Sequence, residues 1–150
     1  MPLDLDAPIL PGLGAAGVRL LDDLDAALAG EEPDERTEYD FGRATVRVGP
    51  VSLGAIDGVI TGFQLGPGYR GKVAGAVGIG STLAEVEAAF GPIATGEEHM
   101  VYVECMPGWW ILATDPPDGA KVSPDSICHD PEARIRLIEV SFAEDGWWTR

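Results

Sequence analysis

One pattern occurs twice in this chain of 150 residues. A glycine-rich segment at 14–18 precedes apolar residues with helical spacing, and a similar segment at 75–79 precedes a similar series. The glycine segments lie 61 positions apart and the helical segments 62, so one inserted residue reconciles the two copies. A period of this length predicts two related supersecondary units, about 14–66 and 75–142, within a single domain that covers 1–150.

The first unit opens with a predicted helix over residues 20–29. Leu21, Leu24 and Leu28 recur there at i, i+3 and i+7, which places them on one face of a helix. Gly30 follows directly and is typical of a helix end. We expect this apolar face to pack against a sheet.

The second predicted helix has clearer boundaries. Thr82 can cap its first turn, and Glu85, three residues later, completes the capping-box pattern. Gly91 and Pro92 then end the helix. The first copy carries Leu20 at the position aligned with the Thr82 cap, so we expect the two copies to have diverged there.

Around the helices, apolar and polar residues alternate as they do in half-buried strands. The clearest hairpin signal is Asp57-Gly58, a dipeptide typical of two-residue turns. The acidic stretch 31–40 reads as a solvated loop or the start of an edge strand, and 115–131 reads as a long polar loop. Strands are predicted at 43–48, 51–56, 59–65, 100–105, 109–114 and 135–142.

The order of these elements predicts an α+β fold. We expect a mostly antiparallel sheet of about six strands with two helices packed on one face, built from a tandem α-β-β-β repeat. Antiparallel sheets tolerate water on one face, so the other face would be partly open. An open, concave sheet face is a natural docking surface for another protein.

The chain is strongly acidic, with 10 Lys and Arg against 25 Asp and Glu and a formal charge of -15. Such a charge repels nucleic-acid phosphates and anionic membrane surfaces and attracts a basic partner. An equally weighted interpretation is that the charge serves solubility. The sequence has no signal-peptide pattern and no apolar run of about 20 residues, which predicts a cytoplasmic protein if Met1 is the natural start.

No residue pattern indicates catalysis. The glycine segment before the second helix resembles a phosphate loop only in spacing, because Ser81 stands where such a loop needs Lys. Cys128 and His129 lack the paired spacing of a zinc site, and Cys105 and Cys128 are expected to be free thiols. We therefore expect no enzyme activity, no metal and no cofactor. The alternative is a small metal-dependent enzyme with the 115–131 loop as its lid.

Two pairs of adjacent tryptophans stand out, Trp109-Trp110 and Trp147-Trp148. Adjacent residues of a strand point to opposite faces, so one tryptophan of the first pair should enter the core and the other should face outward. An outward tryptophan beside carboxylates is typical of a protein-binding surface. The alternative is that the second tryptophan lies under the 115–131 loop.

Residues 80–92, which open the second helix, resemble the helix opening of small outer-membrane assembly lipoproteins and of tandem-repeat β-lactamase-inhibitor proteins. Residues 69–82 also resemble a segment of small bacterial cytosolic proteins regarded as immunity proteins for polymorphic toxins. These resemblances imply a helix-then-sheet unit, which the inhibitors carry in two copies. They transfer no catalytic residue, and this sequence departs from the lipoproteins in having no lipobox cysteine.

Together these features predict a non-enzymatic cytosolic binding protein that neutralises a basic protein partner. The resemblance favours an immunity protein that blocks a bacterial toxin, and an envelope-assembly module is a further alternative. Acidic charge suits an antagonist because opposite charges accelerate association. The candidate partner-binding residues are Glu31, Glu32, Asp34, Glu35, Tyr102, Trp109, Trp110, Asp115, Asp118 and Asp125.

Overall fold

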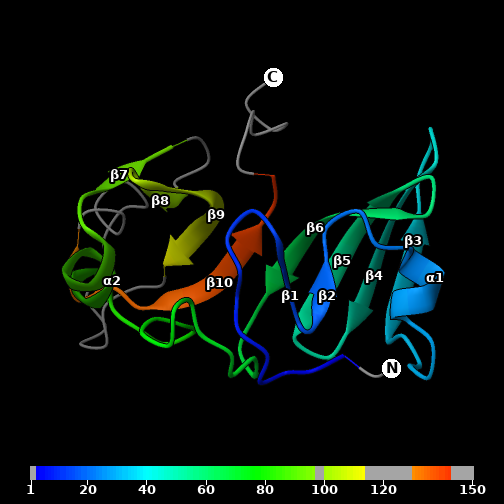
Figure 1. The fold of residues 1–150 in the computed structure, drawn as a ribbon, viewed down its shortest axis with the longest axis horizontal. Helices are drawn as coiled ribbons and strands as arrows, with labels where there is room; N and C mark the ends of the chain where they lie inside the picture. The colour runs from blue at the N-terminus through cyan, green and yellow to red at the C-terminus, as the bar shows by residue number, and fades with distance from the viewer. Residues whose placement is uncertain (1–2, 97–99, 114–129, 143–150) are drawn as a thin grey trace.

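The structure, a computed structural model, describes residues 3–96, 100–113 and 130–142. Within these residues the main feature is an eight-stranded antiparallel sheet, accompanied by a two-stranded sheet and two short helices (Figure 1). The strand order of the main sheet is β3-β4-β5-β6-β10-β9-β8-β7. The elements are β1 (Gly14–Ala15), β2 (Val18–Arg19), α1 (Leu24–Ala27), β3 (Glu35–Glu38), β4 (Arg43–Val48), β5 (Val51–Ile56), β6 (Val59–Leu65), α2 (Leu83–Phe90), β7 (Ile93–Thr95), β8 (Val101–Val103), β9 (Met106–Ala113) and β10 (Ile135–Val140).

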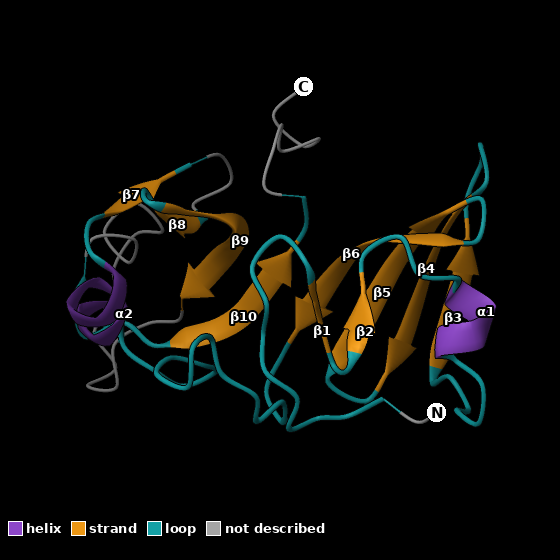
Figure 2. Cartoon of the chain, viewed as in Figure 1, coloured by secondary structure: helices purple, strands orange, loops and turns teal. Residues whose placement is uncertain are grey.

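In the described part of the chain, each half contributes one helix followed by four strands of the main sheet. β3 to β6 form one antiparallel meander, β7 to β10 form the other, and their last strands pair in the middle of the sheet. The helices lie at opposite ends of the sheet (Figure 2). The α+β class and the mostly antiparallel sheet are confirmed. The expected number of about six strands is wrong, because each half has one strand more than the sequence suggested.

The two additional strands, β3 and β7, are short and form the two edges of the sheet. β3 has the charged sequence Glu-Arg-Thr-Glu within the acidic stretch, which matches the edge-strand alternative for that stretch. β7 has only three residues, too few to show alternation. Short or charged edge strands oppose pairing between molecules. The hairpin across Asp57-Gly58 is confirmed, because β5 ends at Ile56 and β6 begins at Val59.

Cross-strand pairs define the two faces of the main sheet, because directly opposite residues point to the same side. One row crosses β4, β5, β6, β10 and β9 as Val46–Leu53–Phe63–Val140–Trp109. Each of these side chains is at most 1% exposed and belongs to the hydrophobic core. We call this side of the sheet the inner face.

β6 and β10 meet symmetrically at the centre of the sheet. Gln64 pairs with Glu139 there. Each strand also has a bulge three residues before this pair. The pairing of β6 with β5 skips Thr61, and the pairing of β10 with β9 skips Arg136. A residue of β6 therefore corresponds to the residue of β10 that lies 75 positions later.

The first helix is shorter than predicted and begins at Leu24 rather than at residue 20. Leu21 does not lie on a buried helix face: it has a φ of 74° and is 64% exposed. Its N–H donates to the Ile60 carbonyl oxygen (2.8 Å), and the Ile60 N–H donates to the Asp22 carbonyl oxygen (3.0 Å). These residues pair with β6 instead of entering a helix, so the expected helix over 20–29 is wrong at its start.

Both helices are capped by a side chain that accepts from the backbone three residues later. In α2 the Thr82 hydroxyl accepts from the Glu85 N–H (3.2 Å) and the Glu85 carboxylate accepts from the Thr82 N–H (3.1 Å), which confirms the capping box. These bonds hold the pKa of the Glu85 carboxyl below its usual value. In α1 the Asp23 carboxylate accepts from the Ala26 N–H (2.9 Å). The caps lie 59 positions apart, so the alignment of Leu20 with Thr82 is wrong.

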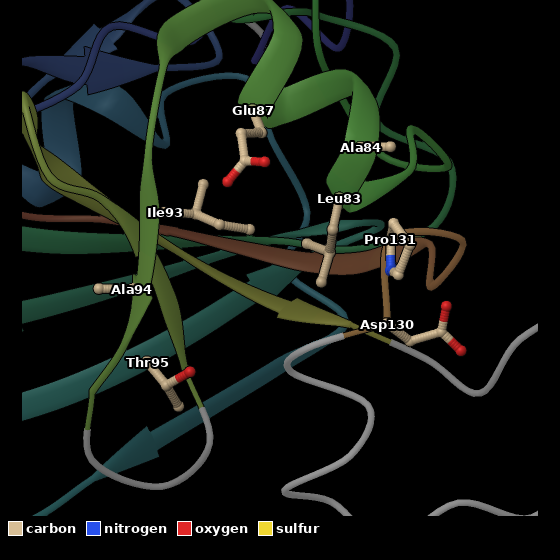
Figure 3. A pocket seen from close by; sticks show the side chains of 8 residues that line it. All are labelled: Leu83, Ala84, Glu87, Ile93, Ala94, Thr95, Asp130 and Pro131. Atoms are coloured by element: carbon tan, nitrogen blue, oxygen red, sulfur yellow. The ribbon is translucent and has the colours of Figure 1, made fainter.

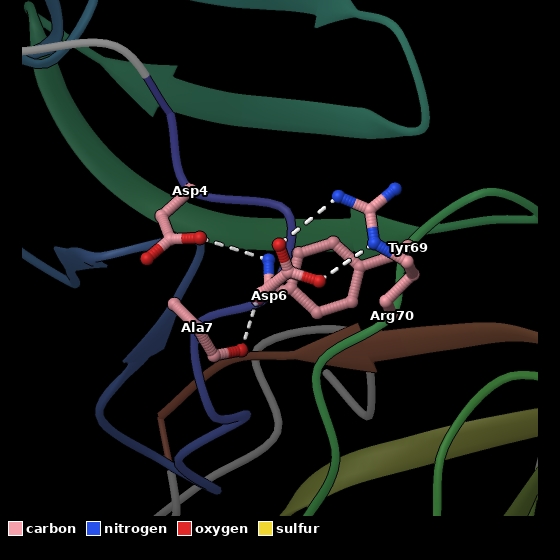
Figure 4. A network of polar contacts seen from close by, with 5 residues as sticks. All are labelled: Asp4, Asp6, Ala7, Tyr69 and Arg70. Atoms are coloured by element: carbon pink, nitrogen blue, oxygen red, sulfur yellow. Dashed lines mark hydrogen bonds and ion pairs between the residues drawn. The ribbon is translucent and has the colours of Figure 1, made fainter.

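Tyr69, in the link between the halves, holds the N-terminal segment in place (Figure 4). Its hydroxyl donates to the Ala7 carbonyl oxygen (2.6 Å) and accepts from the Ala16 N–H (2.8 Å). The side chain is 3% exposed, and this burial raises the pKa of the hydroxyl. Beside it, Arg70 donates twice to the Asp6 carboxylate (2.6 and 3.0 Å), which lowers the pKa of that carboxyl.

Candidate partner-binding surface

The outer face of the sheet is defined by the row next to the inner one. It crosses β4, β5, β6, β10 and β9 as Arg47–Ser52–Gln64–Glu139–Trp110. These side chains are half-buried or exposed. The outer face is therefore mixed in chemistry, with charged, amide, hydroxyl and aromatic groups in one row, whereas the neighbouring inner row is apolar.

The outer face is hollowed over the first half of the sheet. A groove of about 490 Å³ lies over β4, β5, β6 and the end of β10. Its floor contains Gly54 and Gly62, which are directly opposed on β5 and β6. Side chains of Tyr39, Ile56 and Phe142 line its sides. We call this hollow the glycine groove.

The second half of the sheet fills the corresponding place with leucines. Because β10 repeats the bulge of β6, Gly62 corresponds to Leu137. The partner of Gly62 is Gly54, and the partner of Leu137 is Leu112. Both leucines are half-buried. The same backbone arrangement thus accepts either a glycine pair or a leucine pair.

Neither glycine of the groove is required by its own chain. Neither Gly54 nor Gly62 has a positive φ. A Cβ added to Gly54 would approach no atom closer than 3.9 Å, and one added to Gly62 would lie 3.5 Å from the Val140 carbonyl oxygen, an ordinary van der Waals contact. An interior strand glycine marks a bulge or a place of close approach by a ligand or another backbone. The bulge at Thr61 does not by itself require glycine, because the corresponding bulge of β10 carries Leu137 opposite Leu112.

Two turns lie next to the end of the groove that Tyr39 and Ile56 line. Both turns are at the upper right of the ribbon in Figure 1. The β3–β4 turn carries Phe41, which is 89% exposed and has a φ of 64°, and the Asp57 N–H of the β5–β6 turn donates to the Gly42 carbonyl oxygen (2.8 Å). Positive φ is strained for an aromatic residue, and Phe41 gains almost no burial in return. Tyr39 of the first hairpin is 52% exposed and Ile56 of the second is 44% exposed. We call these three exposed apolar side chains, Phe41, Tyr39 and Ile56, the exposed apolar cluster.

The polar groups of the groove balance in charge. Among the described residues that line it, Arg43 is the cation and Glu139 is the anion. The Gln64 amide donates to the Glu139 carboxylate (3.4 Å). Ser141 also lines the groove; it is 1% exposed, and its hydroxyl has no hydrogen-bond partner in the part of the chain that the structure describes.

The predicted acidic contact residues gather at the β3 edge, and several of them interact within the chain. The Glu31 carboxylate accepts from the Leu3 N–H (2.6 Å), and Asp34 accepts from the Gly49 N–H (2.6 Å). Arg47 lies 3.6 Å from the Asp34 carboxylate and 3.9 Å from that of Glu35. Glu31 is half-buried, whereas Glu32, Asp34 and Glu35 remain exposed.

The predicted aromatic contact residues lie in the second half, on β8 and β9, which the strand order separates from the β3 edge. Trp109 is 1% exposed and packs edge-on against Phe90 of α2, with the ring centroids 5.8 Å apart. Trp109 therefore cannot contact a partner. Trp110 is half-buried on the outer face, so the prediction that one tryptophan enters the core is confirmed. Tyr102 is half-buried on the neighbouring strand.

Other predicted positions lie outside the described residues, namely Asp115, Asp118, Asp125, Cys128 and His129. Cys105 is exposed, and its thiol donates to the Phe90 carbonyl oxygen (3.1 Å). In the described ranges no cluster of three or more His, Cys, Asp or Glu could hold a metal ion, and no helix is long and apolar enough to cross a membrane.

A second, smaller cavity of about 190 Å³ lies between α2, β7 and the segment before β10 (Figure 3). Figure 3 shows the carboxylates of Glu87 and Asp130 on different sides of it, with Leu83 and Ile93 between them. Its lining ends at Thr95 and begins again at Asp130, next to stretches outside the described residues. We assign no function to it.

Sequence reasoning missed the glycine groove and the exposed apolar cluster. One local signal was available: Gly54 and Gly62 interrupt two otherwise regular strand patterns, and an interior strand glycine indicates a bulge or a close approach. That the two glycines face each other depends on the register of β5 with β6. The Asp57-Gly58 turn alone would place Gly54 opposite Thr61, and the bulge at Thr61 shifts the pairing by one residue, so the sequence did not reveal the facing pair.

No family model and no curated protein matches this chain. The chain is similar in structure to a solved protein described as the uncharacterized protein yfeY from Escherichia coli, with a TM-score of 0.51 and 14% sequence identity. The similarity covers 94% of this chain and 99% of the other. At this identity it concerns the fold alone: nearly the whole chain follows a backbone arrangement that a solved structure also has.

Proposed function

We propose that this chain is a non-enzymatic binding protein that uses the outer face of its main sheet to hold a basic protein partner. The observation that carries the proposal is the glycine groove, a hollow of about 490 Å³ on that face whose floor the chain leaves without side chains. In its most specific form the protein is an immunity protein that blocks a bacterial toxin in the cytoplasm.

A free outer face is supported by one contact of each helix, both made with residues that belong to the inner row or pair with it. Phe90 of α2 packs against Trp109, a residue of the inner row. At the other end Asp25 of α1 lies 3.6 Å from Arg36, which pairs with Val46 of the same row. A sheet that has one face packed can present the other to solvent or to a partner.

The charge of the chain supports a basic partner. A formal charge of -15 creates a negative potential that accelerates the approach of a cationic protein, and the acceleration falls as salt is added. Glu32 and Glu35 are exposed at the β3 edge. Replacing both with Lys should slow association with the partner and reduce its salt dependence. Replacing Glu87 and Glu132 with Lys makes the same change in net charge at exposed positions of the second half and is the matched control.

A photo-crosslinking experiment tests the proposal. A photoreactive residue placed at Gln64 should capture a basic protein in cells, while one at Ala84 of α2 should not. The captured protein is then expressed alone and together with this chain, and growth is measured. Growth inhibition that this chain relieves is the expected result. An acidic partner, capture from Ala84 only, or inhibition that persists on co-expression would contradict the proposed function.

A further inference from the structure

The glycine groove and the turn beside it share a property: each lowers the stability of the isolated folded chain. A glycine inside a strand weakens the strand, yet Leu112 and Leu137 show that side chains fit at the corresponding place. Phe41 adopts a positive φ and exposes 89% of its side chain. Features that the fold does not need and that weaken it are expected where a partner binds.

We propose that the glycine groove receives an apolar side chain from a cationic segment of the partner protein, and that Phe41 packs over that segment as an aromatic anchor. The proposal rests on the proposed function and names the part of the partner that is recognised. The groove volume of about 490 Å³ falls within the range of about 300–1,000 Å³ that is typical of binding clefts. Aromatic anchors beside such a cleft carry much of the energy of protein interfaces.

The charges around the groove favour a cationic segment with an apolar side chain at its centre. Inside, Arg43 and Glu139 offset each other, and the glycine floor exposes no side chain, so the centre suits an apolar group. Asp40 precedes Phe41 in one turn and Asp57 lies in the turn joined to it by the Asp57 N–H bond to the Gly42 carbonyl oxygen, and both are exposed. A Lys or Arg next to the inserted side chain would meet these carboxylates.

The test uses a random-peptide library displayed on phage, selected on the full-length protein. The key variant is the double substitution Gly54→Leu and Gly62→Leu, which copies the leucine pair of the second half into the first and fills the floor. The second variant, Phe41→Asn, removes the aromatic ring and places a residue that tolerates positive φ. Both variants are expected to fold, which circular dichroism and thermal unfolding check before any binding is measured.

The expected result is enrichment of peptides in which an aromatic or branched aliphatic residue adjoins Lys or Arg. Their binding should weaken at least about tenfold on the double variant and also weaken on Phe41→Asn. Enriched peptides that are acidic, or that bind the double variant equally well, would overturn the proposal. So would a lack of enrichment, or a dimer of this chain that forms through Phe41 in sedimentation experiments.

The failure of this inference can be told apart from a failure of the proposed function. If the crosslinked partner binds the wild type and the double variant equally, the groove is not its site, and the proposed function then depends on the capture at Gln64 and the relief of growth inhibition. If basic peptides are selected through the groove but no toxic basic partner is captured in cells, the groove binds cationic segments and the immunity function is wrong.

Discussion

Before α2, the Gly80 N–H donates to the Ile135 carbonyl oxygen, and the Ile135 N–H donates to the Ser81 carbonyl oxygen, both at 2.8 Å. Before α1, the Leu21 N–H donates to the Ile60 carbonyl oxygen (2.8 Å) and the Ile60 N–H donates to the Asp22 carbonyl oxygen (3.0 Å), which is the same arrangement. Gly80 has a φ of 91° and Leu21 a φ of 74°, so the leucine adopts a conformation that glycine accepts easily. The two halves share backbone geometry even where their sequences differ.

The halves differ most on the outer face. The first half places Ser52 and a glycine pair where the second half places Trp110 and a leucine pair. A partner that covers the centre of this face would meet a hollow on one side and a filled, apolar surface on the other. Because the inner rows and the bulges agree, this difference belongs to the surface and not to the fold.

The largest expected effect concerns the seam that joins the halves. Phe63 of β6 and the corresponding Ile138 of β10 are at most 1% exposed. Phe63→Ala should lower the free energy of unfolding by about 3–5 kcal/mol and Ile138→Ala by about 2–5 kcal/mol, because each leaves a cavity in a shared core. Urea unfolding followed by far-UV circular dichroism, to which the strands of both halves contribute, should show one transition for each variant. Two separate transitions would mean that the halves fold independently.

Sequence reasoning predicted the parts of each half that depend on neighbouring residues. Strands β4, β5 and β6 follow from alternation and the Asp57-Gly58 turn, and α2 follows from its capping box. The start of α1 was missed because Leu21 fits helical spacing, while its actual partner, Ile60, is distant in sequence. The groove was missed for the same reason: whether two glycines face each other is decided by pairing between strands.

A second comparison concerns how the N-terminal segment is held. Tyr69→Phe removes a hydroxyl that pairs with the Ala7 carbonyl oxygen and the Ala16 N–H, both in buried contacts. We expect a loss of about 1–3 kcal/mol in the free energy of unfolding, measured in urea. Tyr39→Phe is the control, because the Tyr39 side chain is 52% exposed. Equal losses for the two variants would contradict this role for Tyr69.

Tyr69 should also make the folded protein less stable at alkaline pH. Its pKa is raised by burial, so the folded state holds the proton more tightly than the unfolded state, whose tyrosine titrates near 10.0. Stability is then fully present below that pH and is lost as the pH rises through the folded pKa. In Tyr69→Phe this alkaline loss should shrink, as thermal unfolding over a pH series would show. If stability fell with rising pH as steeply in Tyr69→Phe as in the wild type, other groups would be responsible for the alkaline loss.

The two helix caps allow a direct comparison between the halves. Asp23→Ala and Thr82→Ala should each lower the free energy of unfolding by about 0.5–2 kcal/mol, since each leaves an N–H of the first turn without its partner. The effect of Thr82→Ala should be the larger, because Glu85 also loses its hydrogen bond to the Thr82 hydroxyl (3.1 Å). A larger effect at Asp23 would reverse this ranking of the two caps.

The α2 cap should also respond to acid. The pKa of Glu85 is lowered from 4.5 by its bonds to Thr82, so its contribution is present above that pH and is lost as the pH falls through the folded pKa. Glu85→Gln can keep the hydrogen bond and removes the titration. The variant should therefore have a shallower loss of stability at low pH, measured by thermal unfolding. Glu87→Gln, an exposed change in the same helix, is the control for the loss of one carboxylate.

The smallest expected change in stability comes from Gly54→Leu with Gly62→Leu. A Cβ has room at both positions. Replacing a glycine inside a strand should stabilise the folded state by about 0.5–1 kcal/mol at each position, which offsets the unfavourable exposure of new apolar surface. We expect the free energy of unfolding to stay the same or rise slightly. The converse variant, Leu112→Gly with Leu137→Gly, should lower it because half-buried apolar area is lost. If the first variant were instead clearly destabilised, the glycine pair would be needed for folding, and the groove could no longer be regarded as a feature retained for binding.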